Sequence, residues 1–216
     1  DIAELAEKSN FLETCFLLFN GELPNSSELE NFKTQVFSHS TLPSPVDKVI
    51  HSMSGNSHPM GVLSSALQAL GGCFPHLCTN TRPADIDSFE EAASLIVASI
   101  PSIAASTYRS SKGENMPEIG NVFSYCENFL HLMFGSASAE PIDSSVSKAL
   151  DLIFLLHADH EQNCSTSTCR MIASGGANAF ASLSGAVSAL WGPLHGGANM
   201  AVIRMLNEIH SAGDDG

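Results

Sequence analysis

The stretch Trp191-Gly192-Pro193-Leu194-His195-Gly196-Gly197-Ala198-Asn199 places a histidine and a glycine pair directly before an apolar-spaced run. That run has helical spacing and contains Ala201, Val202, Met205, Leu206 and Ile209. We therefore expect His195 at the N-terminus of an amphipathic helix. Backbone N–H groups and the helix dipole make such a position partly positive, which disfavours protonation of an imidazole. A neutral imidazole donates one hydrogen bond, as a developing enolate oxygen requires, so the stretch favours enol chemistry.

The composition sets broad limits on function. The chain has 216 residues, of which 44% are hydrophobic and 15% are charged, enough for one sizeable core or two lobes. Its net charge of −14 argues against binding nucleic acid or an anionic membrane through bulk electrostatics. It argues equally against a complete site for polyanionic substrates, because the arginines are limited to Arg82, Arg109, Arg170 and Arg204.

The cysteines and the apolar runs indicate an intracellular protein. Six cysteines without a repeated spacing lie mostly in apolar surroundings, which favours reduced thiols in a reducing compartment. No apolar run approaches the roughly 20 residues needed to span a bilayer. The first residues, Asp1 to Lys8, are typical of an acidic helix rather than of a targeting peptide.

The periodicity along the chain is helical almost throughout, which predicts an all-α fold with antiparallel helix packing. A long helix is expected to begin at Asp87 or Ser88, with Pro101 kinking or breaking it. The segment from Gly113 to Gly120 is expected to be a loop. Further helices are predicted at about 121–135, 144–157, 164–174, 178–191 and 197–210.

Two of these helices are apolar almost all round. One contains the run Ala149 to Leu156, and the other, Ala177 to Trp191, is rich in Ala, Ser and Gly. Full burial in the core and burial in a subunit interface both explain this pattern.

A second histidine-containing segment identifies a resemblance. It reads Leu156-His157-Ala158-Asp159-His160-Glu161-Gln162-Asn163-Cys164-Ser165-Thr166-Ser167-Thr168, and Gly176-Ala177-Asn178 follows it. Together with the 191–199 stretch, it is very similar to the two active-site segments of bacterial-type (type II) citrate synthases. Weaker matches occur in the family's order, including Ser57-His58-Pro59-Met60 and Ser124-Tyr125-Cys126-Glu127-Asn128-Phe129-Leu130.

The resemblance implies a domain organisation and an assembly. Residues 1–195 would form part of the family's large helical domain, and residues 196–216 would begin the segment that leads to the small domain. Family members pair large-domain helices across a two-fold axis, so a homodimer or a higher oligomer is expected.

The resemblance also implies a reaction and its residues. Acetyl-CoA would condense with oxaloacetate to give citrate and CoA, the entry step of the tricarboxylic acid cycle. His195 matches the histidine that stabilises the acetyl enol. His160 and Asn163 match residues that contact and orient oxaloacetate, while Leu194 and Gly196 would line the acetyl-CoA side. Neither a cofactor nor a metal is expected, since acetyl-CoA is a substrate.

Several family residues cannot be assigned in this chain. They are the aspartate base, a second histidine and the arginines that bind carboxylates, all of which lie further along the family pattern. General acid–base groups contribute about 10²–10⁴-fold each, so we expect these 216 residues alone to be inactive.

Three alternatives remain open. The first is 2-methylcitrate synthase, which uses propionyl-CoA, because one methylene gives only about 1–3 kcal/mol of discrimination. The second is a non-catalytic structural subunit with the same helices. The third is a metal site, although its spacings match no established zinc pattern, and its candidate ligands are His157, Asp159, His160, Cys164 and Cys169. The compartment would be the mitochondrial matrix in a eukaryote and the cytoplasm in a bacterium.

Overall fold

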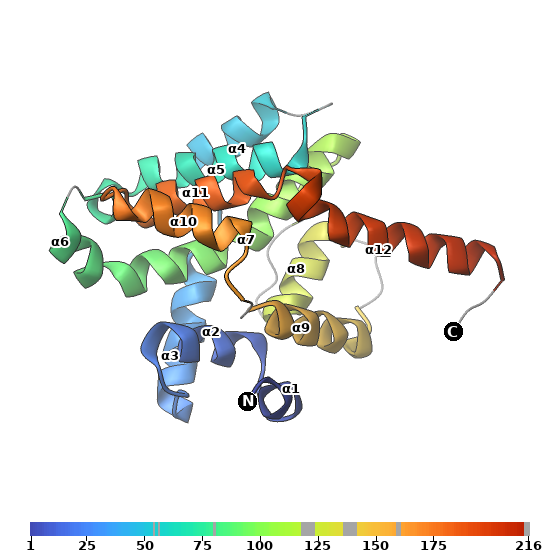
Figure 1. Cartoon of the computed structure of the whole chain (residues 1–216), viewed down its shortest axis with the longest axis horizontal. Coiled ribbons are helices and arrows are strands. Elements are labelled where there is room, and N and C mark those ends of the chain that lie inside the picture. Colours follow the sequence, from blue (N-terminus) through green and yellow to red (C-terminus); the bar gives the residue numbers. More distant parts are fainter. Residues whose placement is uncertain are drawn as a thin grey trace.

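The computed structural model describes residues 1–53, 55, 57–79, 81–117, 124–135, 142–158 and 161–213. All regular structure in these ranges is helical, which confirms the predicted all-α class (Figure 1). The helices are α1 Ile2–Lys8, α2 Phe11–Asn20, α3 Ser26–Ser38, α4 Ser44–Ser52, α5 Pro59–Cys73, the 3₁₀ turn Pro75–Leu77, α6 Arg82–Asp87, α7 Phe89–Lys112, α8 Tyr125–Phe134, α9 Ser144–Ala158, α10 Cys164–Ser174, α11 Ala179–Ala189 and α12 Pro193–Ser211.

Local capping determines where several helices begin and end. Asn25 and Ser124 each form a capping box, with Glu28 and Glu127 respectively, before α3 and α8. The helix predicted at about 121–135 begins at Tyr125, and positions 121–123 of that prediction lie outside the described residues. Gly113 ends α7 in a left-handed conformation, and the described residues 114–117 after it form the predicted loop.

Pro101 lies inside α7 but does not break it, contrary to one of the two expectations for this residue. The helix continues for 24 residues from Phe89 to Lys112, and Pro101 is buried. Proline has no N–H to bond the carbonyl four residues earlier, here that of Val97. The hydroxyl of the buried Tyr125 donates to this carbonyl over 2.8 Å. The acceptor that Pro101 leaves free is thus satisfied by a side chain from α8.

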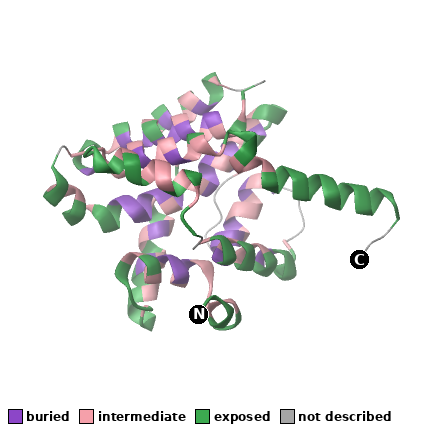
Figure 2. Ribbon diagram, in the orientation of Figure 1, coloured by how far each residue is buried: buried purple, intermediate pink, exposed green. Residues whose placement is uncertain are grey.

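The core consists of two clusters that share α7. In the first, residues of α4, α5 and α7 surround Phe180 of α11, which is completely buried. In the second, α2, α3 and α8 pack against α7, and Phe32 and Cys126 are among its buried residues. Figure 2 shows the buried residues concentrated along α5 and α7. Because α7 contributes to both clusters, it joins the α4–α5–α11 layer to the N-terminal helices.

Asp151 of α9 connects α9 to α2 and α8. Its carboxylate accepts the Phe11 N–H over 3.1 Å and faces the Cys126 thiol at 3.7 Å. Burial raises the pKa of the Asp151 carboxyl, an effect that the Phe11 hydrogen bond opposes. Burial, together with the Asp151 charge, also raises the pKa values of the Cys15 and Cys126 thiols to about 12. All six cysteines of the chain are free thiols in the structure.

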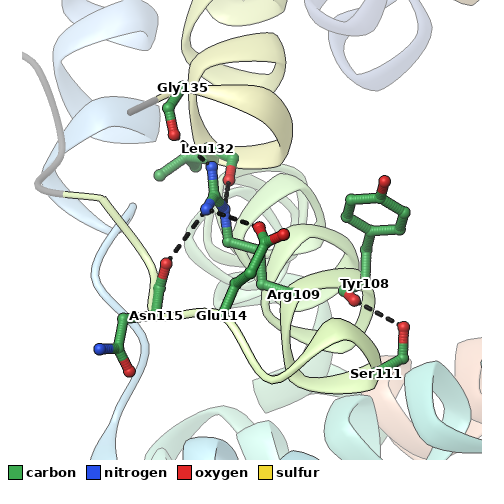
Figure 3. A network of polar contacts seen from close by, with 7 residues as sticks. All are labelled: Tyr108, Arg109, Ser111, Glu114, Asn115, Leu132 and Gly135. Atoms are coloured by element: carbon green, nitrogen blue, oxygen red, sulfur yellow. Dashed lines mark hydrogen bonds and ion pairs between the residues drawn. The ribbon is translucent and has the colours of Figure 1, made fainter. Parts of the chain in front are cut away.

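Arg109 joins the C-terminal ends of α7 and α8 (Figure 3). Its Nε donates to the Leu132 carbonyl over 2.6 Å, and its Nη2 donates to the Gly135 carbonyl over 2.5 Å. Its Nη1 reaches Glu114 and the Asn115 carbonyl, each at 3.2 Å. The side chain is buried, so a single guanidinium satisfies carbonyls that water reaches poorly.

The two apolar helices have different environments. The α11 helix packs against α5 and α10 and buries Phe180, Ser182 and Ala186, so it is a core helix. By contrast, α9 buries only Ser147 and Leu155, and it exposes Val146, Leu152, Ile153 and Leu156. Full burial is therefore wrong for α9, and the interface interpretation stays a prediction.

The last helix, α12, extends away from the other helices (Figures 1 and 2). It begins at Pro193 rather than at the predicted position 197, so His195 lies within its first turn. None of its residues is buried, and its apolar residues from Met200 to Ile209 are exposed. No helix in the described part of the chain is long and apolar enough to cross a membrane.

Candidate active site

Two helix N-termini meet at the candidate site. Asn163 caps α10: its side-chain oxygen accepts the Thr166 N–H over 3.0 Å and the Ser165 hydroxyl over 2.8 Å. The backbone N–H of Ser165 lies in the first turn of α10 and has no acceptor within the helix, as at any helix start. The α10 N-terminus therefore presents a backbone donor to whatever lies before it.

The acceptor for that donor is His195. Gly192 caps α12, Pro193 is its first residue, and the carbonyl of Gly192 accepts the His195 N–H over 3.1 Å. The His195 Nε2 atom accepts the N–H of Ser165 over 3.3 Å. A ring nitrogen that accepts a hydrogen bond carries no proton, so the proton of this imidazole is on Nδ1. This contact leaves Nδ1 as the ring nitrogen that can donate to another group.

Gly196 allows the chain to pass very close to itself beside His195. A Cβ atom at Gly196 would lie 1.8 Å from the carbonyl oxygen of Leu190, at the end of α11. At Gly197 the corresponding distance, to the Pro193 Cβ, is an ordinary 3.9 Å. Gly196 is therefore required for the turn between α11 and α12, whatever contact it makes with a substrate.

The α5, α10 and α11 helices form a fixed frame around this turn. Ser64 of α5 bonds the hydroxyls of Ser184 and Ser188 on α11 at 2.9 and 2.8 Å. A Cβ at Gly185 would lie 2.1 Å from Ile172 Cδ1, so α11 approaches α10 closely. Burial in this region raises the pKa of the Cys169 thiol. Ser165 and the turn that leads to His195 thus adjoin helices that pack directly on one another.

The remaining predicted site residues are placed as follows. Leu194 is fully exposed in the first turn of α12. His157, near the end of α9, contacts the Ile153 carbonyl of the same helix through Nδ1 at 2.7 Å. His160 and Asp159 lie outside the described residues. In the described ranges no group of three potential ligands is positioned to hold a metal.

Two features of the site were not predicted from the sequence. One is the partner of His195, a backbone N–H that any residue other than proline at position 165 would supply. The other is Trp191, whose indole stacks on His58 with ring centroids 5.1 Å apart. The Ser-His-Pro-Met match pointed to His58, but no spacing in the sequence shows that the two rings meet.

Comparison with known proteins identifies the family. The family model "Citrate synthase, C-terminal domain" matches residues 1–215. The chain is also 45% identical to Citrate synthase 1 of Mycobacterium tuberculosis over 99% of its own length and 49% of that protein. The chain belongs to the citrate synthase family. It spans about half the length of the curated relatives it matches.

Solved citrate synthases have the same fold. The Pyrobaculum aerophilum enzyme superposes with a TM-score of 0.86 at 32% identity, over 96% of this chain and 52% of that one. The Thermotoga maritima enzyme gives a TM-score of 0.78 at 34% identity, with the same coverage. A ternary complex of the Thermoplasma acidophilum enzyme with carboxymethyl coenzyme A and oxaloacetate shares the fold, with a TM-score of 0.85 at 24% identity.

Proposed function

We propose that the protein containing this chain condenses acetyl-CoA with oxaloacetate to give citrate and CoA. The family membership supports a citrate-synthase-type acyl transfer. The observation that carries the proposal is the position of His195, whose Nε2 accepts the Ser165 N–H. In the proposed enzyme, Nδ1 would supply the N–H donor for a substrate.

The chemistry follows from that donor. A thioester carbonyl held at Nδ1 would gain negative charge on oxygen as the adjacent methyl loses a proton to a base. A preorganised hydrogen bond stabilises the charge where it develops. The enol carbon then attacks the keto carbon of oxaloacetate, and hydrolysis of the thioester releases CoA and citrate. The base is not assigned among these 216 residues, and for that reason we propose that they are inactive alone.

We further propose that His160, Asn163, Leu194 and Gly196 contact the substrates, as the resemblance implies. Asn163 would contact the substrate through its side-chain amide nitrogen, because its side-chain oxygen already caps α10. The exposed apolar side chains of α9 support the proposal that a homodimer forms through the large-domain helices. The Mycobacterium relative favours the cytoplasm over the mitochondrial matrix.

The test is an assay of thiol release by the natural polypeptide that contains this chain. Acetyl-CoA and propionyl-CoA are each supplied with oxaloacetate. Oxaloacetate-dependent thiol release that is faster with acetyl-CoA would support the proposal, whereas a preference for propionyl-CoA would establish the 2-methylcitrate alternative. No release with either donor would leave the structural-subunit alternative.

A His195→Ala variant tests the role of the imidazole. Loss of one preorganised donor typically lowers kcat about 10²–10³-fold. His76→Ala is the control, because His76 lies at the surface, where it pairs with Glu91. A His195→Ala enzyme as active as the His76→Ala enzyme would contradict the proposal.

A further inference from the structure

His195 follows closely after a half-exposed tryptophan whose ring contacts the start of α5. Trp191 lies between the end of α11 and the start of α12, and its indole packs over the first turn of α5. His58, the cap of α5, stacks on the indole with an interplanar angle of 15°. The turn that carries His195 is therefore attached to a third helix, in addition to α10 and α11.

Gly61 is the second component of this attachment. A Cβ at Gly61 would lie 2.7 Å from Cζ3 and 3.1 Å from Cη2 of Trp191, closer than real Cβ contacts allow. The indole thus lies directly on the backbone of α5, and only glycine leaves it room. Because α5 is fixed to α11 through Ser64, this contact determines the direction in which the chain leaves α11.

We propose that His58, Gly61 and Trp191 position His195 against the Ser165 N–H. The proposal rests on the function proposed above. The three residues act through the turn and not on the substrate: the indole fixes the backbone at position 191, and the Leu190–Gly196 contact fixes it at position 196. His195 lies between these two fixed points. Displacement of the indole would shift the imidazole relative to Ser165, whose hydrogen bond sets the tautomer of the ring.

The first test compares two alanine substitutions in the same helix, made in the natural polypeptide. Gly61→Ala forces the indole to move, whereas Gly72→Ala adds a Cβ that meets nothing within 4 Å. A misplacement of about 1 Å can lower kcat about 10²-fold, so Gly61→Ala is expected to lower kcat about 10–100-fold. The KM for oxaloacetate and the thermal midpoint should change little. Gly72→Ala should match the wild type, and equal kcat values for the two variants would overturn the proposal.

A double-mutant cycle tests whether Gly61 acts through the indole. Trp191→Phe replaces the indole with a smaller ring that leaves room for a Cβ at position 61. Gly61→Ala should therefore lower kcat much less in the Trp191→Phe background than in the wild type. An equal loss in both backgrounds would show that Gly61 acts in some other way, and the proposal would fail.

Two substitutions at His58 separate stacking from capping. The His58 Nδ1 accepts the Met60 N–H over 3.3 Å, so the residue also caps α5. His58→Asn retains a capping acceptor but loses the stacked ring, whereas His58→Phe retains the ring but loses the cap. The proposal requires a reduced kcat in His58→Asn and a nearly normal kcat in His58→Phe. The reverse order would show a role in capping alone.

A crystal structure of the Gly61→Ala protein distinguishes failure of this inference from failure of the proposed function. The inference requires the Ser165 N to His195 Nε2 distance to lengthen from 3.3 Å, whether or not the protein condenses acetyl-CoA. An unchanged distance beside a displaced indole would refute it. Absence of thiol release by the wild-type protein would refute the proposed function alone.

Discussion

Replacement of Gly196 by alanine should inactivate the site without unfolding the protein. The new Cβ would lie 1.8 Å from the Leu190 carbonyl oxygen, whereas real Cβ contacts essentially never fall below 3.0 Å. One of the two backbone segments must therefore move by at least about 1.2 Å. The carbonyl of Leu190 belongs to the end of α11, which packs on α5 and α10, so most of the movement should occur in the first turn of α12.

His195 is the neighbour of Gly196, so the displacement acts directly on the imidazole. It would lengthen the 3.3 Å hydrogen bond from Ser165 and misplace the Nδ1 donor. A 1 Å misplacement is associated with about a 10²-fold loss of rate, and we expect a loss of this size in kcat. Overpacking of this kind costs about 1–3 kcal/mol, which should appear as a modest fall in the thermal midpoint.

The assay is oxaloacetate-dependent thiol release by the natural polypeptide, with Gly197→Ala as the matched control. A Cβ at Gly197 meets Pro193 at 3.9 Å, an ordinary contact. Alanine within a helix is about 0.5–1 kcal/mol more favourable than glycine, so Gly197→Ala should be at least as stable as the wild type. A Gly196→Ala enzyme with kcat within about threefold of the Gly197→Ala enzyme would refute the reasoning, because misplacement by this distance costs far more.

Three further predictions concern stability, each measured by urea unfolding of the natural polypeptide. Tyr125→Phe removes the donor to the Val97 carbonyl and should lower the free energy of unfolding by about 1–3 kcal/mol. The loss should be smaller in a Pro101→Ala background, because the alanine N–H at position 101 can bond that carbonyl. Equal losses in the two backgrounds would contradict this account. Arg109→Met leaves two buried carbonyls without donors and should lower the free energy of unfolding by about 2–5 kcal/mol. A loss below about 1 kcal/mol would contradict this prediction. Burial raises the pKa of the Asp151 carboxyl, so the folded protein holds this proton at higher pH than the unfolded chain and loses stability as the pH rises through that range. The free energy of unfolding of Asp151→Asn, relative to that of the wild type, should therefore increase as the pH rises above about 4. A relative free energy of unfolding that falls as the pH rises would contradict this prediction.

The sequence was sufficient to predict the parts of the fold that depend on local patterns. Helical spacing gave the all-α class, and cap residues such as Asn163 and Gly113 lie where helices begin or end. Pro101 shows the limit of local reasoning. Whether a proline breaks a helix depends on the fate of the carbonyl it leaves free, and here a tyrosine 24 positions further along the chain provides the donor. The exposure of α12 likewise depends on tertiary packing, which amphipathic spacing does not reveal.

The same division applies to the candidate site. The resemblance and the helix-start pattern both pointed to His195, because its position depends on neighbouring glycines and an adjacent helix. The Ser165 donor could not be found in this way, since a backbone N–H is common to nearly every residue. Gly61 and Trp191 are 130 positions apart, and their contact depends on how α5 packs against α11.

A backbone donor has a chemical advantage over a side chain as the partner of His195. A hydroxyl or a carboxyl group can accept as well as donate, so it permits either tautomer of the imidazole. The Ser165 N–H can only donate, and a protonated Nε2 would point its hydrogen at the Ser165 hydrogen across a nitrogen-to-nitrogen distance of 3.3 Å. The α10 N-terminus therefore disfavours a proton on Nε2. The tautomer that remains has its hydrogen on Nδ1, which is the donor that the proposed enol stabilisation requires.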